Sequence, residues 1–195
     1  MFLQILILDC NEISFTIVEA WNNSPDAFIL TIDTRILDSN SSADSQLSLE
    51  INSTFSSEYD FSIDWGDHQF NNNVTSNLTH SYLTPGVYTI SIIGNYPAHY
   101  YSSPNRDNDK LVSIDQWGTQ EWKSMRQAFY YCETMTYNAT DIPDLSAVTN
   151  MDSMFGVASS FNGNINNWDV SNVTDMSAMF DGSAFNQNIK ICFRG

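Results

Sequence analysis

Positive charge is scarce in this chain of 195 residues. Seven Lys and Arg residues stand against 23 Asp and Glu residues, which gives a formal net charge of −16 at pH 7. Binding to a nucleic-acid backbone depends on Lys and Arg side chains that replace its counterions, and docking on an anionic membrane surface needs the same groups. The composition therefore argues against nucleic acid and anionic lipid as partners.

Cysteine and histidine are also rare, with three residues of each. Cys10, Cys132 and Cys192 are too scattered for a disulfide framework or a zinc site. Cys132 follows an aromatic run, and we expect it to be a small buried side chain. No P-loop, dinucleotide fingerprint, nucleophile elbow or HExxH motif occurs. We therefore predict no catalytic residue, no metal site and no cofactor, and we expect that the protein is not an enzyme.

A long apolar run is missing as well. Residues 1–8 are apolar except for Gln4, but a membrane-spanning helix needs about 20 apolar residues, so we predict no integral membrane segment. The basic start and the small-residue cleavage site of a secretory signal are not found in this stretch. We interpret residues 1–26 as an N-terminal segment that is either an edge strand or a misplaced start.

Short strands dominate the predicted structure of residues 27–101. Phe28, Leu30 and Ile32 alternate with other residues, and similar alternation recurs at 47–51, 59–63 and 87–93. Turn signals separate these runs, and Pro and Gly at residues 85–86 suit a type II turn. Several short strands at this spacing predict an antiparallel β-sandwich.

Two carboxylates flank the turn at residues 65–67. Asp64 and Asp67 could bind calcium, which takes several oxygen ligands, or their side chains could accept backbone hydrogen bonds in Asx turns. The nearest third carboxylate, Asp60, lies back along the preceding strand, so we favour the Asx turns.

Three motifs follow one another in this half of the chain: Phe-Ser-Ile-Asp-Trp-Gly-Asp at 61–67, His-Ser-Tyr at 80–82 and Pro-Gly-Val-Tyr-Thr-Ile at 85–90. In this order and spacing they resemble a PKD-type immunoglobulin-like domain. His68 stands where that family usually has Gly. The resemblance implies a PKD-like sandwich over residues 27–101 that serves as an extracellular spacer or interaction module. The resemblance also implies that His80 is a structural residue rather than a base.

The second half is repetitive. Residues 144–155 (DLSAVTNMDSMF) recur 25 positions later as 169–180 (DVSNVTDMSAMF), and FNGNI at 161–165 recurs 24 positions later as FNQNI at 185–189. A weaker copy begins at Met125. A sustained period of 24 to 26 residues predicts a solenoid.

Each repeat combines two apolar patterns. Val148, Met151, Met154 and Phe155 fall at i, i+3, i+6 and i+7, which favours a short helix with a core-packing Met stripe. The alternation at 161–165 predicts a short strand that carries asparagines on one face. We expect Asn162 and Asn164 to lie beside Asn186 and Asn188 of the next repeat. Their side chains could point outward toward a ligand or inward as a hydrogen-bonded ladder, and the sequence leaves both alternatives open.

The repeats resemble the BspA-like leucine-rich-repeat surface proteins, whose repeat runs roughly W-D-V-S-N-V-T-D-M-S-x-M-F. Residues 168–189 match this pattern nearly throughout and residues 144–165 match it closely. The resemblance implies a bacterial or protist protein, extracellular or on the cell surface, that is associated with adhesion and matrix binding.

We therefore predict a mixed fold, with an all-β PKD/Ig-like sandwich at 27–101 and a short leucine-rich-repeat-like solenoid of short strands and short helices at 102–195. We expect the repeat array to be truncated, because residues 190–195 make a poor polar cap. The predicted function is non-catalytic binding or adhesion, with a protein or glycan on a cell or matrix surface as the partner. The predicted ligand-binding residues are Asn162, Asn164, Asn186, Asn188, Phe161 and Phe185.

Two alternatives remain. The protein could be a structural spacer or stalk that positions another module. More remotely, it could be a fragment of a carbohydrate-active enzyme, although no pair of carboxylates flanking a sugar site can be singled out.

Overall fold

The computed structural model describes residues 21, 24–38, 41–101 and 107–189. Within them lie eight strands and two short 3-10 helices, η1 (Ser53–Phe55) and η2 (Asp107–Lys110). The strands are β1 (Phe28–Asp33), β2 (Gln46–Leu49), β3 (Asp60–Asp64), β4 (Phe70–Val74), β5 (Leu78–Ser81), β6 (Val87–Asn95), β7 (Leu111–Gln116) and β8 (Thr136–Tyr137).

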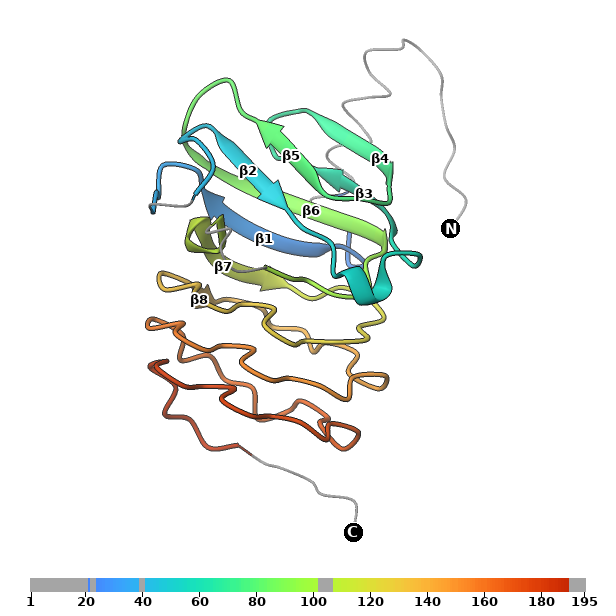
Figure 1. Ribbon diagram of the computed structural model, residues 1–195, viewed down its shortest axis with the longest axis vertical. Coiled ribbons are helices and arrows are strands. Elements are labelled where there is room, and N and C mark those ends of the chain that lie inside the picture. Colours follow the sequence, from blue (N-terminus) through green and yellow to red (C-terminus); the bar gives the residue numbers. More distant parts are fainter. Residues whose placement is uncertain (1–20, 22–23, 39–40, 102–106, 190–195) are drawn as a thin grey trace.

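A six-stranded sheet in the order β4-β3-β6-β1-β7-β8 forms the upper part of the molecule (Figure 1). Strand β1 pairs antiparallel with β6 on one side and with β7 on the other, whereas β7 and β8 pair in parallel. Four of the six residues of β1 are buried, as expected for an interior strand rich in apolar and β-branched side chains. The sheet continues past residue 101, because β7 and β8 follow that position.

A second, two-stranded sheet consists of β2 and β5, which pair antiparallel from Gln46–Ser81 to Leu49–Leu78. Leu47 and Leu49 are buried and belong to the same apolar core as the large sheet. The strands predicted from alternation near 28–32, 47–51, 59–63 and 87–93 are therefore found as β1, β2, β3 and β6.

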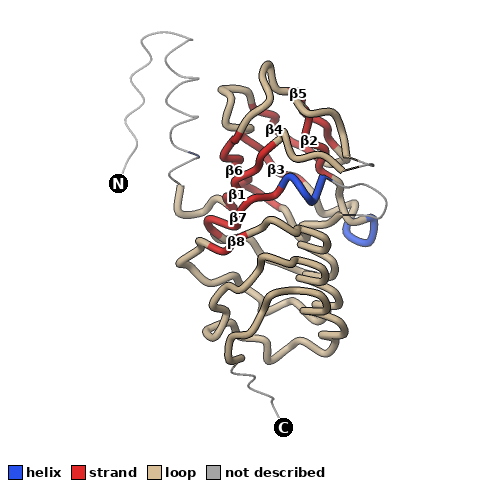
Figure 2. Tube along the Cα trace, turned by 90° about the vertical axis from the view of Figure 1, so that its left-hand side faces the viewer, coloured by secondary structure: helices blue, strands red, loops and turns tan. Residues whose placement is uncertain are grey.

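The predicted fold class is wrong. The described residues form one mixed six-stranded sheet and one two-stranded sheet instead of a sandwich followed by a solenoid of short strands and short helices. No α-helix occurs among residues 24–38, 41–101 and 107–189, and after β7 the only strand in the described part of the chain is β8. Figure 2 shows the repeats as loops below the strands. Alternation identified the strands of the first half, but it could not reveal that β7 of the second half completes their sheet.

Backbone hydrogen bonds between repeats explain why the predicted helices do not form. Alternate N–H groups of residues 151–157 donate to alternate carbonyl groups of residues 175–181, with N···O distances of 2.6–2.9 Å. One repeat earlier, residues 125–131 donate in the same way to residues 150–156 at 2.9–3.0 Å. An α-helix needs these N–H groups for carbonyls four residues earlier. They are used to join successive repeats instead.

Left-handed residues also interrupt the predicted helices. Each repeat has two of them, with φ between +51° and +71°: Gln127 and Tyr131, Ser153 and Val157, Ala178 and Gly182. A right-handed helix cannot continue through this conformation. The apolar stripe at i, i+3, i+6 and i+7 therefore arises from successive tight turns.

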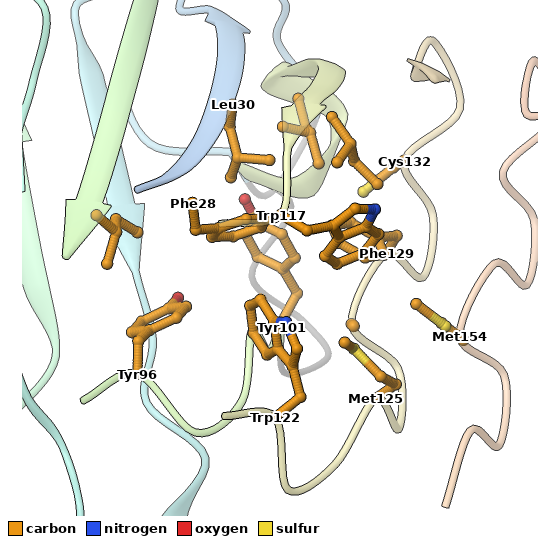
Figure 3. Packing of buried hydrophobic residues seen from close by; sticks show 14 of the residues in the cluster. Phe28, Leu30, Tyr96, Tyr101, Trp117, Trp122, Met125, Phe129, Cys132 and Met154 are labelled. Carbon is orange, nitrogen blue, oxygen red and sulfur yellow. The ribbon is translucent and has the colours of Figure 1, made fainter. Parts of the chain in front are cut away.

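One apolar core joins the sheet to the repeats (Figure 3). The ring of Phe28 in β1 stacks on Trp117 at a centroid distance of 5.7 Å, and Trp117 contacts Phe129 of the first repeat at 5.9 Å. Phe129, Phe155 and Phe180 then form a column of stacked rings with spacings of 5.6 and 5.8 Å. The repeat period thus places one phenylalanine above the next.

The Met stripe and Cys132 lie in this same core. Met151, Met154 and Cys132 are fully buried, which confirms the predicted packing roles. The predicted N-terminal segment 1–26 falls largely outside the described residues, as does the tail 190–195 on which the expected truncation rests. Within the described part of the chain, no helix has the length and apolar character that a membrane span requires.

Candidate functional site

The four asparagines predicted to bind a ligand lie on one face of the repeats. Buried and exposed residues alternate from Phe161 to Ile165, and both Asn162 and Asn164 are exposed. Asn186 and Asn188 are exposed at the equivalent positions of the next repeat. Of the two alternatives that the sequence left open, the structure has the outward orientation. We call the face formed by these four residues the asparagine surface.

Hydrogen bonds fix the first two amides of the asparagine surface. The Asn162 Oδ1 accepts from the backbone N–H of Asn186 and from Gln187 Nε2, each at 3.1 Å. The Asn164 Oδ1 accepts from the backbone N–H of Asn166 at 3.1 Å. Each amide has two N–H donors as well as its oxygen, and these contacts use the oxygens only. The structure therefore joins Asn162 to the next repeat through its side-chain oxygen.

Phe161 and Phe185 lie behind the asparagines. Phe161 is 0% exposed and Phe185 is partly buried. Their rings stack at a centroid distance of 6.0 Å with an interplanar angle of 14°. As placed, the two rings hold the backbone of the asparagine surface at a fixed spacing.

Exposed polar residues of the repeats continue beyond the asparagine surface that the sequence pattern identified. Thr136 and Asn138 occupy the equivalent positions one repeat earlier and are exposed. Asn138 Nδ2 donates to Asp115 Oδ1 at 2.9 Å, and the same carboxylate accepts from Thr31 Oγ1 and Ser113 Oγ at 2.7 and 2.8 Å. Sequence reasoning missed this extension because MTYNA at 135–139 shares only Asn138 with FNGNI. The alternation of Met135, Tyr137 and Ala139 with the polar Thr136 and Asn138 would have been the signal.

The turn at residues 64–69 is closed by its own side chains. Asp64 Oδ1 accepts from the Gly66 N–H at 2.9 Å and Asp67 Oδ1 accepts from the Gln69 N–H at 3.1 Å, which confirms the predicted Asx turns. Asp67 Oδ2 contacts His80 Nε2 at 2.9 Å, so His80 is held by the turn. Burial raises the pKa of Asp64.

Two titratable groups lie deep in the core where the sheet meets the repeats. His99 is surrounded by aromatic rings, and its Nδ1 lies 2.9 Å from the Tyr96 hydroxyl. Burial lowers the pKa of His99 to about 3, and burial also raises the pKa of the Cys132 thiol. Because these side chains are 1% and 0% exposed, their role is in packing.

Among residues 21, 24–38, 41–101 and 107–189, no three His, Cys, Asp or Glu side chains come together in a way that could hold a metal ion. The carboxylate of Asp115 is occupied by three neutral donors.

Comparison with known protein families gives a match, and it covers the second half of the chain. Residues 101–192 match the model of a family described as "Mycoplasma protein of unknown function, DUF285". This half is therefore similar to that family, and the matched range includes the whole asparagine surface. Comparisons with curated proteins and with solved structures gave no match.

Proposed function

We propose that the protein is a non-catalytic binding protein, secreted or displayed at a cell surface, whose ligand contacts the asparagine surface. The observation that carries this proposal is the recurrence of outward-facing amides at the same two positions of successive repeats. The partner is a protein or glycan on a cell or matrix surface.

The chemistry of the amide supports such a partner. An amide side chain supplies two donors and one acceptor oxygen without charge, which suits the hydroxyl groups of glycans and the peptide groups of proteins. The backbone bonds between repeats and the stacked rings of Phe161 and Phe185 hold these amides in place. Groups that are already ordered lose little entropy on binding, so several weak contacts can add up to useful affinity.

Similarity in sequence supports the location outside the cell. The repeats at 144–165 and 168–189 follow the pattern of BspA-like surface proteins, and residues 61–67 resemble the turn of PKD-type modules. Both kinds of protein are extracellular, and the BspA-like proteins are associated with adhesion. On this proposal the first half presents the repeats to their ligand.

A structural spacer is the second candidate, and one contact favours it. The Asn162 Oδ1 is already bonded to Asn186 and Gln187 of the next repeat. If all four asparagines served in this way, the asparagine surface would stabilise the contacts between repeats and would bind no ligand.

The test is an array of matrix proteins and glycans probed with the full chain and two matched variants. Asn164→Asp/Asn188→Asp keeps the side-chain oxygen that accepts from Asn166 but removes the amide donors and adds two charges. Asn72→Asp/Asn77→Asp makes the same change on exposed residues of the first half, where the Asn77 Oδ1 accepts from the Ile51 N–H.

We expect the variant at 164 and 188 to bind at least about tenfold more weakly, since each lost hydrogen bond contributes on the order of 1 kcal/mol. The control variant should bind as the parent does, with a similar melting temperature for all three. If both variants bind equally well, the asparagine surface is not the binding site, and the structural spacer is the better account of the protein.

A further inference from the structure

A polar groove of about 360 Å³ lies where the first half of the chain meets the repeats. Residues 52–55, which include η1, form one wall together with Tyr100. The other wall comes from the turns of the first two repeats and consists of Lys123, Ser124, Arg126, Thr149 and Asn150. Ligand pockets in proteins span roughly 300–1,000 Å³, so this groove suits a ligand of one or two rings.

Basic side chains are concentrated at this groove. The structure describes four basic residues, Arg35, Lys110, Lys123 and Arg126, in a chain with a net charge of −16. Lys110 is buried, whereas Lys123 and Arg126 both line the groove. The groove is thus the one place among the described residues where two accessible cations lie together.

Acidic partners hold both cations in position. Lys123 pairs with Glu58, which follows η1 in the first half, so this ion pair links the repeat wall to the first half of the chain. Arg126 Nε contacts Asp152 Oδ2 at 3.3 Å, and 47% of the Arg126 side chain is exposed. A guanidinium has five N–H donors. With Nε engaged, its two terminal nitrogens can still bind a second, planar anion in the bidentate geometry that carboxylates favour.

The remaining lining residues match a sugar ring. Ser53 and Thr54 supply hydroxyl groups for sugar hydroxyls, and Phe55 and Tyr100 supply aromatic rings for its apolar face. From these features together we propose that the groove binds a sugar carrying a carboxylate, with Arg126 on the carboxylate and the opposite wall on the ring. The proposal is independent of the asparagine surface, which contributes no residue to the groove.

The experiment is an NMR titration of the full, isotope-labelled chain. The probes are sialyllactose, which carries one carboxylate, lactose as its neutral counterpart, and acetate as a carboxylate without a sugar. The matched variants are Arg126→Gln and Arg35→Gln, because Arg35 also pairs with an aspartate, Asp33, but lies outside the groove. Arg126→Lys keeps the charge and removes the bidentate geometry. The dispersion of each spectrum reports whether the variant is folded.

Sialyllactose should shift the amide signals of residues 52–55 and 123–126, and lactose should bind at least about tenfold more weakly. Arg126→Gln and Arg126→Lys should each weaken binding at least about tenfold, whereas Arg35→Gln should leave it unchanged. The proposal is overturned if lactose or acetate reproduces the shifts at equal concentration, if Arg35→Gln weakens binding as much as Arg126→Gln, or if about 10 mM sialyllactose shifts no signal in the groove.

Discussion

The buried imidazole of His99 makes a quantitative prediction about acid stability. The side chain is 1% exposed and packs among aromatic rings from β1, from the segment after β6 and from the first repeat. Burial lowers its pKa from 6.5 to about 3. Because the folded protein resists protonation at this site, the contribution of His99 to stability is full above pH 6.5 and is lost as the pH falls toward 3.

The size of the effect follows from linkage. Between about pH 7.5 and pH 5 the unfolded chain protonates this histidine and the folded chain does not, which lowers the free energy of unfolding by about 2 kcal/mol. Over the full interval down to pH 3 the loss is on the order of 5 kcal/mol. A loss of the smaller size is already a large fraction of the stability of an ordinary domain.

The assay is urea unfolding of the parent, His99→Gln and His68→Asn at about pH 7.5 and about pH 5. His68 is exposed in the turn that follows Trp65, so its variant controls for the removal of a histidine. We expect His99→Gln to be less stable than the parent at neutral pH but to lose about 2 kcal/mol less on acidification. Equal losses in all three proteins would show that His99 is protonated in the fold, which refutes the reasoning.

Three further substitutions test the packing by urea unfolding. Lys110→Met should cost about 3–5 kcal/mol because it leaves the buried Asp107 carboxylate without its cation; a loss below about 1 kcal/mol would contradict this. Gly163→Ala should cost about 1–3 kcal/mol, since a Cβ there would lie 2.5 Å from the Cβ of Tyr137; an unchanged midpoint would mean that Tyr137 can move aside. Val157→Gly should stabilise by about 1 kcal/mol because it relieves a β-branched residue at φ +58°; a net loss would mean that the side-chain contacts of Val157 outweigh the strain.

Part of the fold could be predicted because alternation in a strand is a local property. Phe28, Leu30 and Ile32 report burial on one face whatever their partners are, and β1 lies where the pattern placed it. The pairing of β1 with β7 was not predictable, because the two strands are far apart in sequence and neither pattern specifies its neighbour. Sheet assembly was the missing information.

The helices were predicted wrongly because their signal was ambiguous. Apolar residues at i, i+3, i+6 and i+7 describe one face of a helix, but tight turns that bring every third or fourth residue inward give the same pattern. Ser153 has a left-handed backbone conformation, which excludes the helix. The sequence gives no sign of this conformation, because glycine is the residue that adopts it freely and position 153 holds a serine.

The candidate site was predictable in position and undecided in orientation. The FNxNI motif placed Asn162 and Asn164 on one face, and the alternation with Phe161 and Ile165 required one face to be apolar and buried. The bond from Asn186 to Asn162 was beyond sequence reasoning, because it depends on the step between repeats. The groove of Lys123 and Arg126 left no sequence signal either, since its walls come from separate segments of the chain that only the fold brings together.

The central claim is that a ligand contacts the asparagine surface, and a hydrogen-exchange footprint tests it most directly. The full chain is compared free and bound to the tightest ligand from the array. We predict added protection of backbone amides at 161–165 and 185–189 and unchanged exchange at 70–77 in the first half. Protection confined to residues 24–101, with 161–189 unchanged, would contradict the account.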